Sequence, residues 1–195
     1  MGPRPDLAPF VAAVTSGGVG AVQFRDKDGE WLDQVAGLEA VRAGAHPGTL
    51  VSANDRADLA VLTGVDILHV GQRDIPVRDA RRLVGPDVLV GTSCHDRDQV
   101  LAALDDPDVD YFCVGPTWPT PTKPGRPAAG LELTRFAAAR AGSKPWFAIG
   151  GIDETTLDDV LDAGATRAVV VRVLTDSPDP AATAARLAAR LRAAA

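Results

Sequence analysis

Two cations and an amide alternate in the segment from Gln23 to Lys27, which ends a short apolar run. Successive side chains of a strand point to opposite faces, so Gln23, Arg25 and Lys27 are expected to share one face. Phe24 and Asp26 then point the other way. A guanidinium and an ammonium that face one point suit an anion such as phosphate. The alternative is a charged turn in solvent, and this segment alone does not decide between the two.

Two carboxylates stand at the ends of the next two apolar runs. Asp55 follows Asn54, and Asp74 ends the segment that begins at Gly71. Neighbouring parallel strands lie about 4.8 Å apart, so Asp55 and Asp74 can converge beside the cations. Mg²⁺ binds through one or two carboxylates together with substrate phosphates. Each aspartate also precedes a helical pattern, and the competing interpretation makes both of them helix caps.

The segment from Gly115 to Gly125 is rich in proline and threonine and carries one lysine, Lys123. Proline excludes a helix interior or a central strand, so a stiff loop is expected. Because such a loop loses little entropy on ordering, its hydroxyls and its ammonium can be held ready for a phosphate or a carboxylate. A proline-rich linker is the alternative. Strand–helix patterns on both sides favour the loop.

Three further strand ends carry groups that suit an anion. Ser93 could bind a diphosphate or cap the next helix, whereas His69 lies within a run and is expected to be a core histidine. Gly150 and Gly151 precede a helical pattern, where backbone N–H groups can approach an anion at the helix N-terminus, or simply form a tight turn. The last run ends at Arg172, and loops after the last two strands of a barrel frequently hold a phosphate.

The elements that must position these groups recur regularly. Runs rich in Val, Ile and Leu span residues 20–24, 49–53, 67–70, 88–92, 111–114, 146–149 and 168–171. Their nearly continuous apolar character is typical of parallel strands that are covered on both faces. Helical patterns lie between them, with Asp28, Asp153 and Asp179 as expected caps and Pro76 and Gly85 as expected ends of one helix. Repeated strand–helix units indicate an α/β fold in one domain, residues 1–195.

A (β/α)8 barrel and an open doubly wound sheet both fit these units. No dinucleotide-type glycine fingerprint follows the first run, and polar residues end nearly every run, as they do around the rim of a barrel. The sequence therefore favours the (β/α)8 TIM barrel. Its first strand is missing, because the chain opens with a helical pattern at residues 6–16. Either the start is misassigned, a segment was lost, or the barrel is open on one side; contacts in a homo-oligomer could cover the gap.

The composition excludes several classes of function. The chain has 195 residues, 46% hydrophobic and 24% charged, with a net charge of -6, which is ordinary for a globular protein. No basic cluster is present, so a nucleic-acid partner is not expected. No run reaches membrane-spanning length, and residues 1–6 lack the apolar stretch of a signal peptide, so we expect no membrane partner and a cytoplasmic protein. Cys94 and Cys113 are expected to be reduced core residues.

Six motifs, in order and over nearly the whole chain, resemble those of the thiamine-phosphate synthase family. They are Val22-Gln23-Phe24-Arg25-Asp26-Lys27, Asn54-Asp55-Arg56, His69-Val70-Gly71-Gln72-Arg73-Asp74, Gly91-Thr92-Ser93-Cys94-His95, the segment from Gly115 through Lys123, and Ala148-Ile149-Gly150-Gly151-Ile152. The resemblance implies a (β/α)8 barrel with Mg²⁺ as cofactor and two small-molecule substrates. It implies that hydroxymethylpyrimidine diphosphate and a thiazole phosphate are joined to give thiamine monophosphate and diphosphate.

The resemblance also assigns a role to each residue of the rim. The residues that contact the pyrimidine diphosphate are Gln23, Arg25, Lys27, Asn54, Ser93 and Lys123. Those on the thiazole phosphate side are Thr120, Thr122, Gly151, Val171 and Arg172, where Arg172 replaces the serine that the family typically has. Asp55 and Asp74 match the Mg²⁺ ligands. The residues expected to be catalytic, because they meet the charge of the leaving diphosphate, are Arg25, Lys27, Ser93 and Lys123.

Three other functions compete with this interpretation. A related thiazole tautomerase works, as the resemblance has it, through a loop histidine, and the segment from Gly115 to Gly125 has none. A non-catalytic thiamine-phosphate-binding protein would hold its ligand without turnover, but the diphosphate and metal residues are all retained. An unrelated phosphate-binding isomerase remains open, because fold alone does not determine function.

Overall fold

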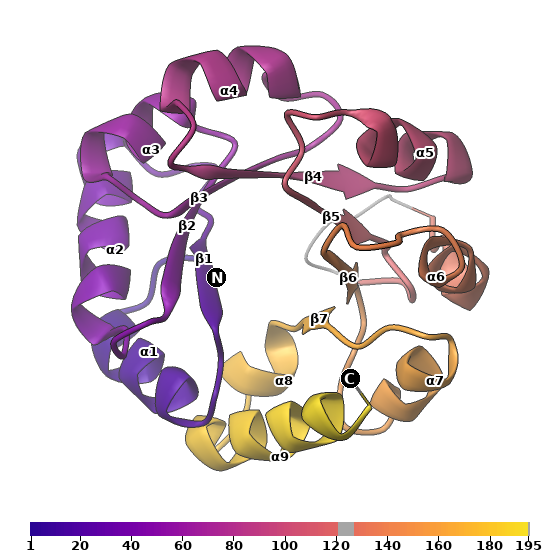
Figure 1. Cartoon of the computed structure of the whole chain (residues 1–195). Helices are drawn as coiled ribbons and strands as arrows, with labels where there is room; N and C mark the ends of the chain where they lie inside the picture. Colours follow the sequence, from indigo (N-terminus) through magenta and orange to yellow (C-terminus); the bar gives the residue numbers. More distant parts are fainter. Residues whose placement is uncertain (121–126, 195) are drawn as a thin grey trace.

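The computed structural model describes residues 1–120 and 127–194 (Figure 1). Within these ranges seven strands form one parallel sheet, and their order in the sheet is their order in the sequence. The strands are β1 (Ala21–Phe24), β2 (Leu50–Asn54), β3 (Ile67–Val70), β4 (Leu89–Cys94), β5 (Tyr111–Val114), β6 (Trp146–Ile149) and β7 (Ala168–Val169). All seven predicted strands are confirmed. The last one ends at Val169, two residues earlier than predicted.

Helices surround the curved sheet, as Figure 1 shows. They are α1 (Leu7–Ser16), α2 (Trp31–Gly44), α3 (Ala57–Thr63), α4 (Val77–Val84), α5 (Arg97–Asp105), α6 (Gly130–Ala138), α7 (Leu157–Asp162), α8 (Arg172–Thr175) and α9 (Pro180–Ala193). None of the helices in the described ranges is long and apolar enough to span a membrane.

The ring of helices closes where the sheet does not. In the described sheet β1 pairs only with β2, and β7 only with β6, so the sheet is open and curved, as expected of a barrel that lacks its first strand, and the eight strands of a (β/α)8 barrel are not found there. Gly17, just after α1, packs against α9 so closely that a Cβ atom there would lie 2.7 Å from the Cβ of Ala184. On the other edge of β1, Met1 N donates to Gln23 O (2.6 Å) and Met1 O accepts from Arg25 N (2.7 Å). Met1 therefore bonds to β1 in the way that a residue of a neighbouring parallel strand would.

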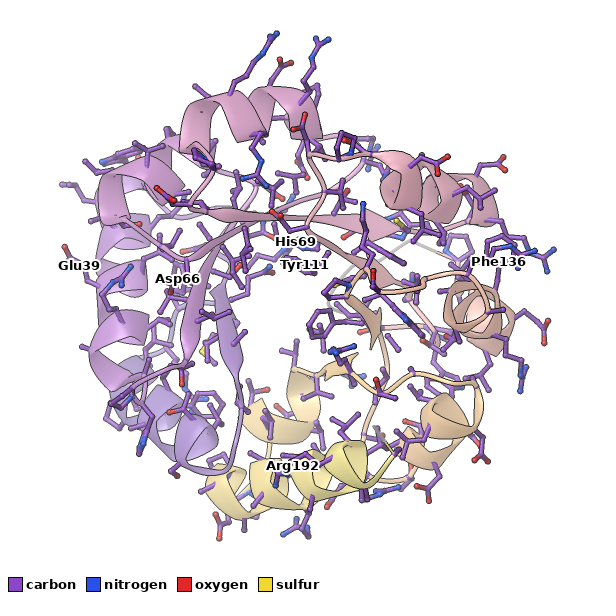
Figure 2. All side chains as sticks on the ribbon, in the orientation of Figure 1. Glu39, Asp66, His69, Tyr111, Phe136 and Arg192 are labelled. Carbon is purple, nitrogen blue, oxygen red and sulfur yellow. The ribbon has the colours of Figure 1, made fainter. Side chains whose placement is uncertain are left out.

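The two faces of the sheet differ in polarity. Leu68, Val70 and Phe112 point outward and are fully buried beneath the helices. The inner face carries polar side chains among apolar ones such as Phe147, and Figure 2 shows His69 and Tyr111 there, in the middle of the molecule. Burial of the outward-facing apolar residues therefore holds the helices to the sheet, and the inner face is left for polar groups.

The predicted helix ends were correct in part. Asp179 caps α9 by accepting from Ala182 N (3.0 Å), and Pro76 and Gly85 flank α4 as predicted. Asp28 does not cap α2, because the N-cap position belongs to Glu30 and no side chain caps it. The helix expected from residue 154 begins only at Leu157. Both cysteines are free and buried, as expected.

Helices α1 and α2 meet at Gly44, where a Cβ atom would overlap the carbonyl oxygen of Ala8 and lie 2.9 Å from its Cα. We expect Gly44→Ala to destabilise the fold by about 1–3 kcal/mol, because backbone atoms must move to admit the methyl group. Gly20→Ala is the matched control, since nothing lies within 4 Å of a Cβ atom at Gly20. Urea unfolding of both variants measures the difference, and equal losses would contradict the close contact of α1 with α2.

Candidate active site

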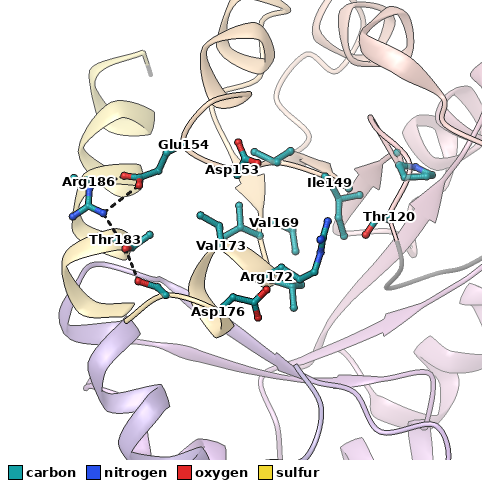
Figure 3. A pocket seen from close by; sticks show the side chains of 18 of the residues that line it. Thr120, Ile149, Asp153, Glu154, Val169, Arg172, Val173, Asp176, Thr183 and Arg186 are labelled. Atoms are coloured by element: carbon teal, nitrogen blue, oxygen red, sulfur yellow. Dashed lines mark hydrogen bonds and ion pairs between the residues drawn. The ribbon is translucent and has the colours of Figure 1, made fainter. Parts of the chain in front are cut away.

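A cavity of about 540 Å³ opens at the carboxyl ends of β4 to β7 and is bounded by α8 and the start of α9 (Figure 3). The structure brings together here a large share of the predicted substrate-binding residues. Those that line the cavity are Ser93, Thr120, Gly151, Val171 and Arg172. Residues from four separate strand ends therefore share one hollow, and Ser93, which the sequence analysis assigned to the diphosphate side, lies in it together with residues assigned to the thiazole phosphate side.

The proline-threonine segment and the glycine pair, which the sequence singled out separately, are joined by backbone hydrogen bonds. Thr117 N donates to Ile149 O (2.9 Å), and Trp118 N donates to Gly150 O (3.0 Å). At Gly150 a Cβ atom would lie 2.6 Å from the Cα of Pro116, so a side chain cannot be accommodated without moving the backbone. The start of the proline-threonine segment is thereby held against the end of β6.

The glycine pair forms a tight turn rather than the N-terminus of a helix. Gly150 and Gly151 have φ values of 101° and 72°, a region that favours glycine. Helix α7 begins only at Leu157, so the predicted helix terminus beside Gly151 is wrong. The intervening residues turn around Asp153, whose carboxylate accepts from Thr155 N (2.8 Å). A hydrogen bond from the Thr155 hydroxyl, the largest cause, lowers the pKa of Asp153.

The predicted end of the last strand is a short helix instead. Val171 is the N-cap residue of α8, and Arg172 is its first residue. No side chain caps α8, and the first N–H groups of a helix have no partner within it. Figure 3 shows the Arg172 side chain in the cavity, directed towards Thr120 and Ile149. Arg172 thus adds a guanidinium to a wall that also carries backbone donors.

The ends of β1 and β2 meet through an ion pair. Lys27 Nζ lies 2.8 Å from Asp55 Oδ2, and the Asp55 side chain is 19% exposed. Asp55 has a φ of 62°, the one positive value at a non-glycine position in the described ranges. Arg56 N donates to Asn54 O (2.7 Å) across it, which makes a strained γ-turn. Strain of this kind is often found at functional sites.

Asp74 is held in the loop after β3, the strand next to β2. Its Oδ2 atom accepts from Gly71 N (2.9 Å). The competing interpretation, in which both aspartates cap helices, is wrong: Arg56 occupies the N-cap position of α3 and Pro76 that of α4. Both carboxylates therefore belong to the loops that follow two neighbouring strands, and neither of them caps a helix.

Arg25, directly after β1, contributes a buried donor. Its Nε atom is buried and has no hydrogen-bond partner among the described residues. A buried N–H group without an acceptor costs free energy, so an acceptor is expected to be supplied from outside, and an oxygen of a bound anion would satisfy it. The buried, unpaired Nε–H group of Arg25 is therefore a candidate donor to a bound anion.

Ser93 does not cap the helix that follows it. Asp96 does so, by accepting from Gln99 N (2.8 Å). The Ser93 hydroxyl instead lies 3.0 Å from His69 Nε2, and His69 is buried and hydrogen-bonded, as predicted for a core histidine. Tyr111, the other partner of His69, was missed by the sequence analysis. Its one signal was Gly91, because an isolated glycine within a strand can mark a close approach.

Two predicted residues, Thr122 and Lys123, lie outside the described residues. In the described ranges no three His, Cys, Asp or Glu side chains are grouped so that they could hold a metal ion. The remaining predicted residues form two sets on one rim. One set lines the cavity, and the other, Gln23, Arg25, Lys27, Asn54, Asp55 and Asp74, lies at the ends of β1, β2 and β3.

An open ring of β/α units with polar and charged groups at the carboxyl ends of its strands is the arrangement of barrel-type α/β enzymes, whose sites lie at that rim. Residues 2–174 match the sequence profile of the family described as thiamine monophosphate synthase. The chain belongs to this family, and the relationship predicted from the six motifs is confirmed.

Named relatives agree with this assignment. The thiamine-phosphate synthase of Acidothermus cellulolyticus is 56% identical over 191 residues, which cover 97% of this chain and 90% of that protein. The thiamine-phosphate synthase of Mycobacterium marinum is 53% identical over 201 residues, with 98% and 91% covered. The solved structure of thiamine phosphate pyrophosphorylase from Pyrococcus furiosus has a TM-score of 0.83 at 23% identity, with 96% and 90% covered. This last likeness shows the shared fold.

The contact of Gly151 with the proline-threonine segment can be tested by substitution. Gly151 has a positive φ, and a Cβ atom there would lie 2.7 Å from the Cβ of Trp118. Gly142 also has a positive φ (56°) but has open space around it. We expect Gly142→Ala to cost about 1 kcal/mol and Gly151→Ala at least twice as much, because only the latter adds a clash. Urea unfolding compares the two, and equal costs would contradict the packing of Trp118 on Gly151.

Proposed function

We propose that this chain is a transferase that joins hydroxymethylpyrimidine diphosphate to a thiazole phosphate, forming thiamine monophosphate and releasing diphosphate. The observation that carries the proposal is the division of one rim into two anion-binding sets. A reaction between a diphosphate and a phosphate compound needs two such sets within reach of each other. The membership of the chain in the thiamine monophosphate synthase family supports the same reaction.

The reaction requires charge stabilisation more than acid–base chemistry. The bond between the pyrimidine methylene carbon and the diphosphate oxygen breaks, and the diphosphate leaves with the electron pair. The ring nitrogen of the thiazole then forms the new bond to that carbon. Arg25 and Lys27, with Ser93 and Lys123, would meet the negative charge of the leaving diphosphate. No protein nucleophile is needed, and positioning of the two substrates accounts for much of the rate.

The residues after β2 and β3 fit Mg²⁺. Asp55 and Asp74 each use one carboxylate oxygen within the protein, towards Lys27 Nζ and Gly71 N respectively. Mg²⁺ needs only one or two carboxylates when substrate phosphates and water supply its other ligands. When bound there, the ion would neutralise charge on the diphosphate. Lys27 then has two tasks, to hold the Asp55 carboxylate and to contact the same diphosphate.

The part of the cavity at the ends of β6 and β7 fits the thiazole phosphate, whereas Ser93, on β4, lies at the edge of the cavity next to the diphosphate side. Gly151, Val171 and Arg172 lie together at the ends of β6 and β7. The Arg172 guanidinium and the backbone N–H groups of these turns can bind a phosphate there. Thr120 approaches from the opposite wall in Figure 3. Thr122 and Lys123 are included on the family resemblance alone.

The direct experiment is synthesis of thiamine monophosphate by the purified chain from its two substrates, with and without Mg²⁺. The proposal expects product only when both substrates and Mg²⁺ are present, with release of one diphosphate per product. Binding of both substrates without any product would favour a binding protein. Consumption of the thiazole phosphate alone, with isomerisation of its ring, would favour a tautomerase.

The metal assignment has its own test in Asp74→Asn. The amide retains an oxygen for Gly71 N–H but loses the charge that a Mg²⁺ ligand provides, so we expect turnover to fall about a hundredfold at limiting Mg²⁺. Asp79→Asn, on the exposed surface of α4, is the matched control and should be unchanged. Initial rates over a Mg²⁺ titration measure both. If the rate of the Asp74→Asn enzyme depended on Mg²⁺ concentration as the wild-type rate does, Asp74 would not be a ligand of the metal.

A further inference from the structure

A chain of hydrogen bonds crosses the inner face of the sheet and ends at the cavity. Tyr111 Oη lies 2.9 Å from His69 Nδ1, and His69 Nε2 lies 3.0 Å from Ser93 Oγ. His69 is 6% exposed and Ser93 4% exposed, and Ser93 borders the cavity. Figure 2 shows His69 and Tyr111 side by side on the inner face, and their ring centroids are 5.6 Å apart.

The strand register builds this chain. His69 on β3 pairs with Gly91 on β4, and Gly91 pairs with Tyr111 on β5. Tyr111 reaches across an entire strand, and it can do so because Gly91 has no side chain: a Cβ atom there would overlap the tyrosine ring. Phe147 packs edge-on against the other side of that ring, with centroids 5.5 Å apart. The phenol is thereby aimed at His69.

The direction of each hydrogen bond follows from the available donors and acceptors. In the described part of the chain the Tyr111 hydroxyl has His69 Nδ1 as its hydrogen-bond partner. Burial raises the pKa of Tyr111 well above its ordinary value, so the phenol keeps its proton. A buried hydroxyl hydrogen needs an acceptor, and Nδ1 is the partner within reach, so Tyr111 is inferred to donate to it. A neutral imidazole that accepts at Nδ1 carries its hydrogen on Nε2. His69 Nε2–H therefore donates to Ser93 Oγ.

This order leaves the hydrogen of the Ser93 hydroxyl for the cavity. Ser93 Oγ accepts from His69, and its own hydrogen must then point elsewhere. The opposite order would turn that hydrogen back towards His69 and present only lone pairs to the cavity. Diphosphate oxygens are acceptors and need a donor. Gln72 Nε2 also donates to Ser93 O (2.7 Å), which holds the backbone of this strand end in place.

We propose that His69 and Tyr111 are positioning residues that orient the Ser93 hydroxyl as a hydrogen-bond donor to the departing diphosphate. The inference rests on the proposed function, because it takes the diphosphate as the acceptor. Ser93 touches the substrate, whereas His69 and Tyr111 act through Ser93.

The first test is the tautomer of His69 and needs no activity. Two-bond ¹H–¹⁵N spectra of histidine-labelled protein distinguish the Nε2–H from the Nδ1–H form, and the chain has only 3 histidines to assign. The wild type should show His69 as Nε2–H, with and without inorganic diphosphate and Mg²⁺. Tyr111→Phe removes the donor to Nδ1 and should raise the Nδ1–H population. A wild-type His69 in the Nδ1–H form would overturn the proposal.

The second test is a double-mutant cycle on turnover. Tyr111→Phe keeps the ring and should lower kcat roughly tenfold, the effect of one misdirected hydrogen bond. Ser93→Ala should lower it about a hundredfold. In the double variant Tyr111→Phe should add nothing to Ser93→Ala, because its effect passes through the serine hydroxyl.

The control is Phe112→Leu, a buried neighbour of Tyr111 on the outward face of β5. It disturbs packing but leaves the hydrogen-bond chain intact. The loss of kcat in the Phe112→Leu, Ser93→Ala double variant should therefore be the product of the two single losses. If the losses of kcat caused by Tyr111→Phe and by Ser93→Ala multiplied in the double variant, Tyr111 would have only a structural role and the proposal would be overturned. Absence of product with the wild type would instead overturn the proposed function, and the tautomer result would stand apart from it.

Discussion

The parallel hydrogen-bonded ladder of the sheet is the constraint on which the site depends. Because every strand runs in the same direction, all carboxyl ends reach one rim, and residues that lie far apart in the sequence meet there. Lys27 and Asp55 form an ion pair across the ends of β1 and β2. Thr117 and Ile149 are joined by a backbone hydrogen bond across the ends of β5 and β6. The same ladder therefore builds both of the sides to which the proposed function assigns the two substrates.

The two faces of this sheet have different roles. Outward residues such as Leu68 and Phe112 are buried beneath the helices and provide the stability of the fold. Inward residues pair polar groups with one another, so that a tyrosine, a histidine and a serine form a continuous chain towards the rim. A polar interior is stable only when its groups are satisfied, and this arrangement satisfies them while leaving one hydroxyl hydrogen for a ligand.

The sequence predicted the strands within a few residues, because continuous apolar runs need little context to be recognised. It placed the end of β7 too late, since Val170 and Val171 are as apolar as the strand, and only the three-dimensional arrangement turns them towards α8. Asp153 was misread as a helix cap because its carboxylate serves the turn before α7. The role of Tyr111 could not be predicted, since it depends on the register of three strands and no local pattern records register.

The central claim is that one rim binds diphosphate on one side and thiazole phosphate on the other. The most direct measurement is a crystal structure of the protein with thiamine monophosphate, diphosphate and Mg²⁺. The account predicts the diphosphate on Arg25, Lys27 and Ser93, and the product phosphate at Gly151 and the start of α8. A diphosphate bound at Gly151 and α8, with no ligand near Arg25, would contradict it.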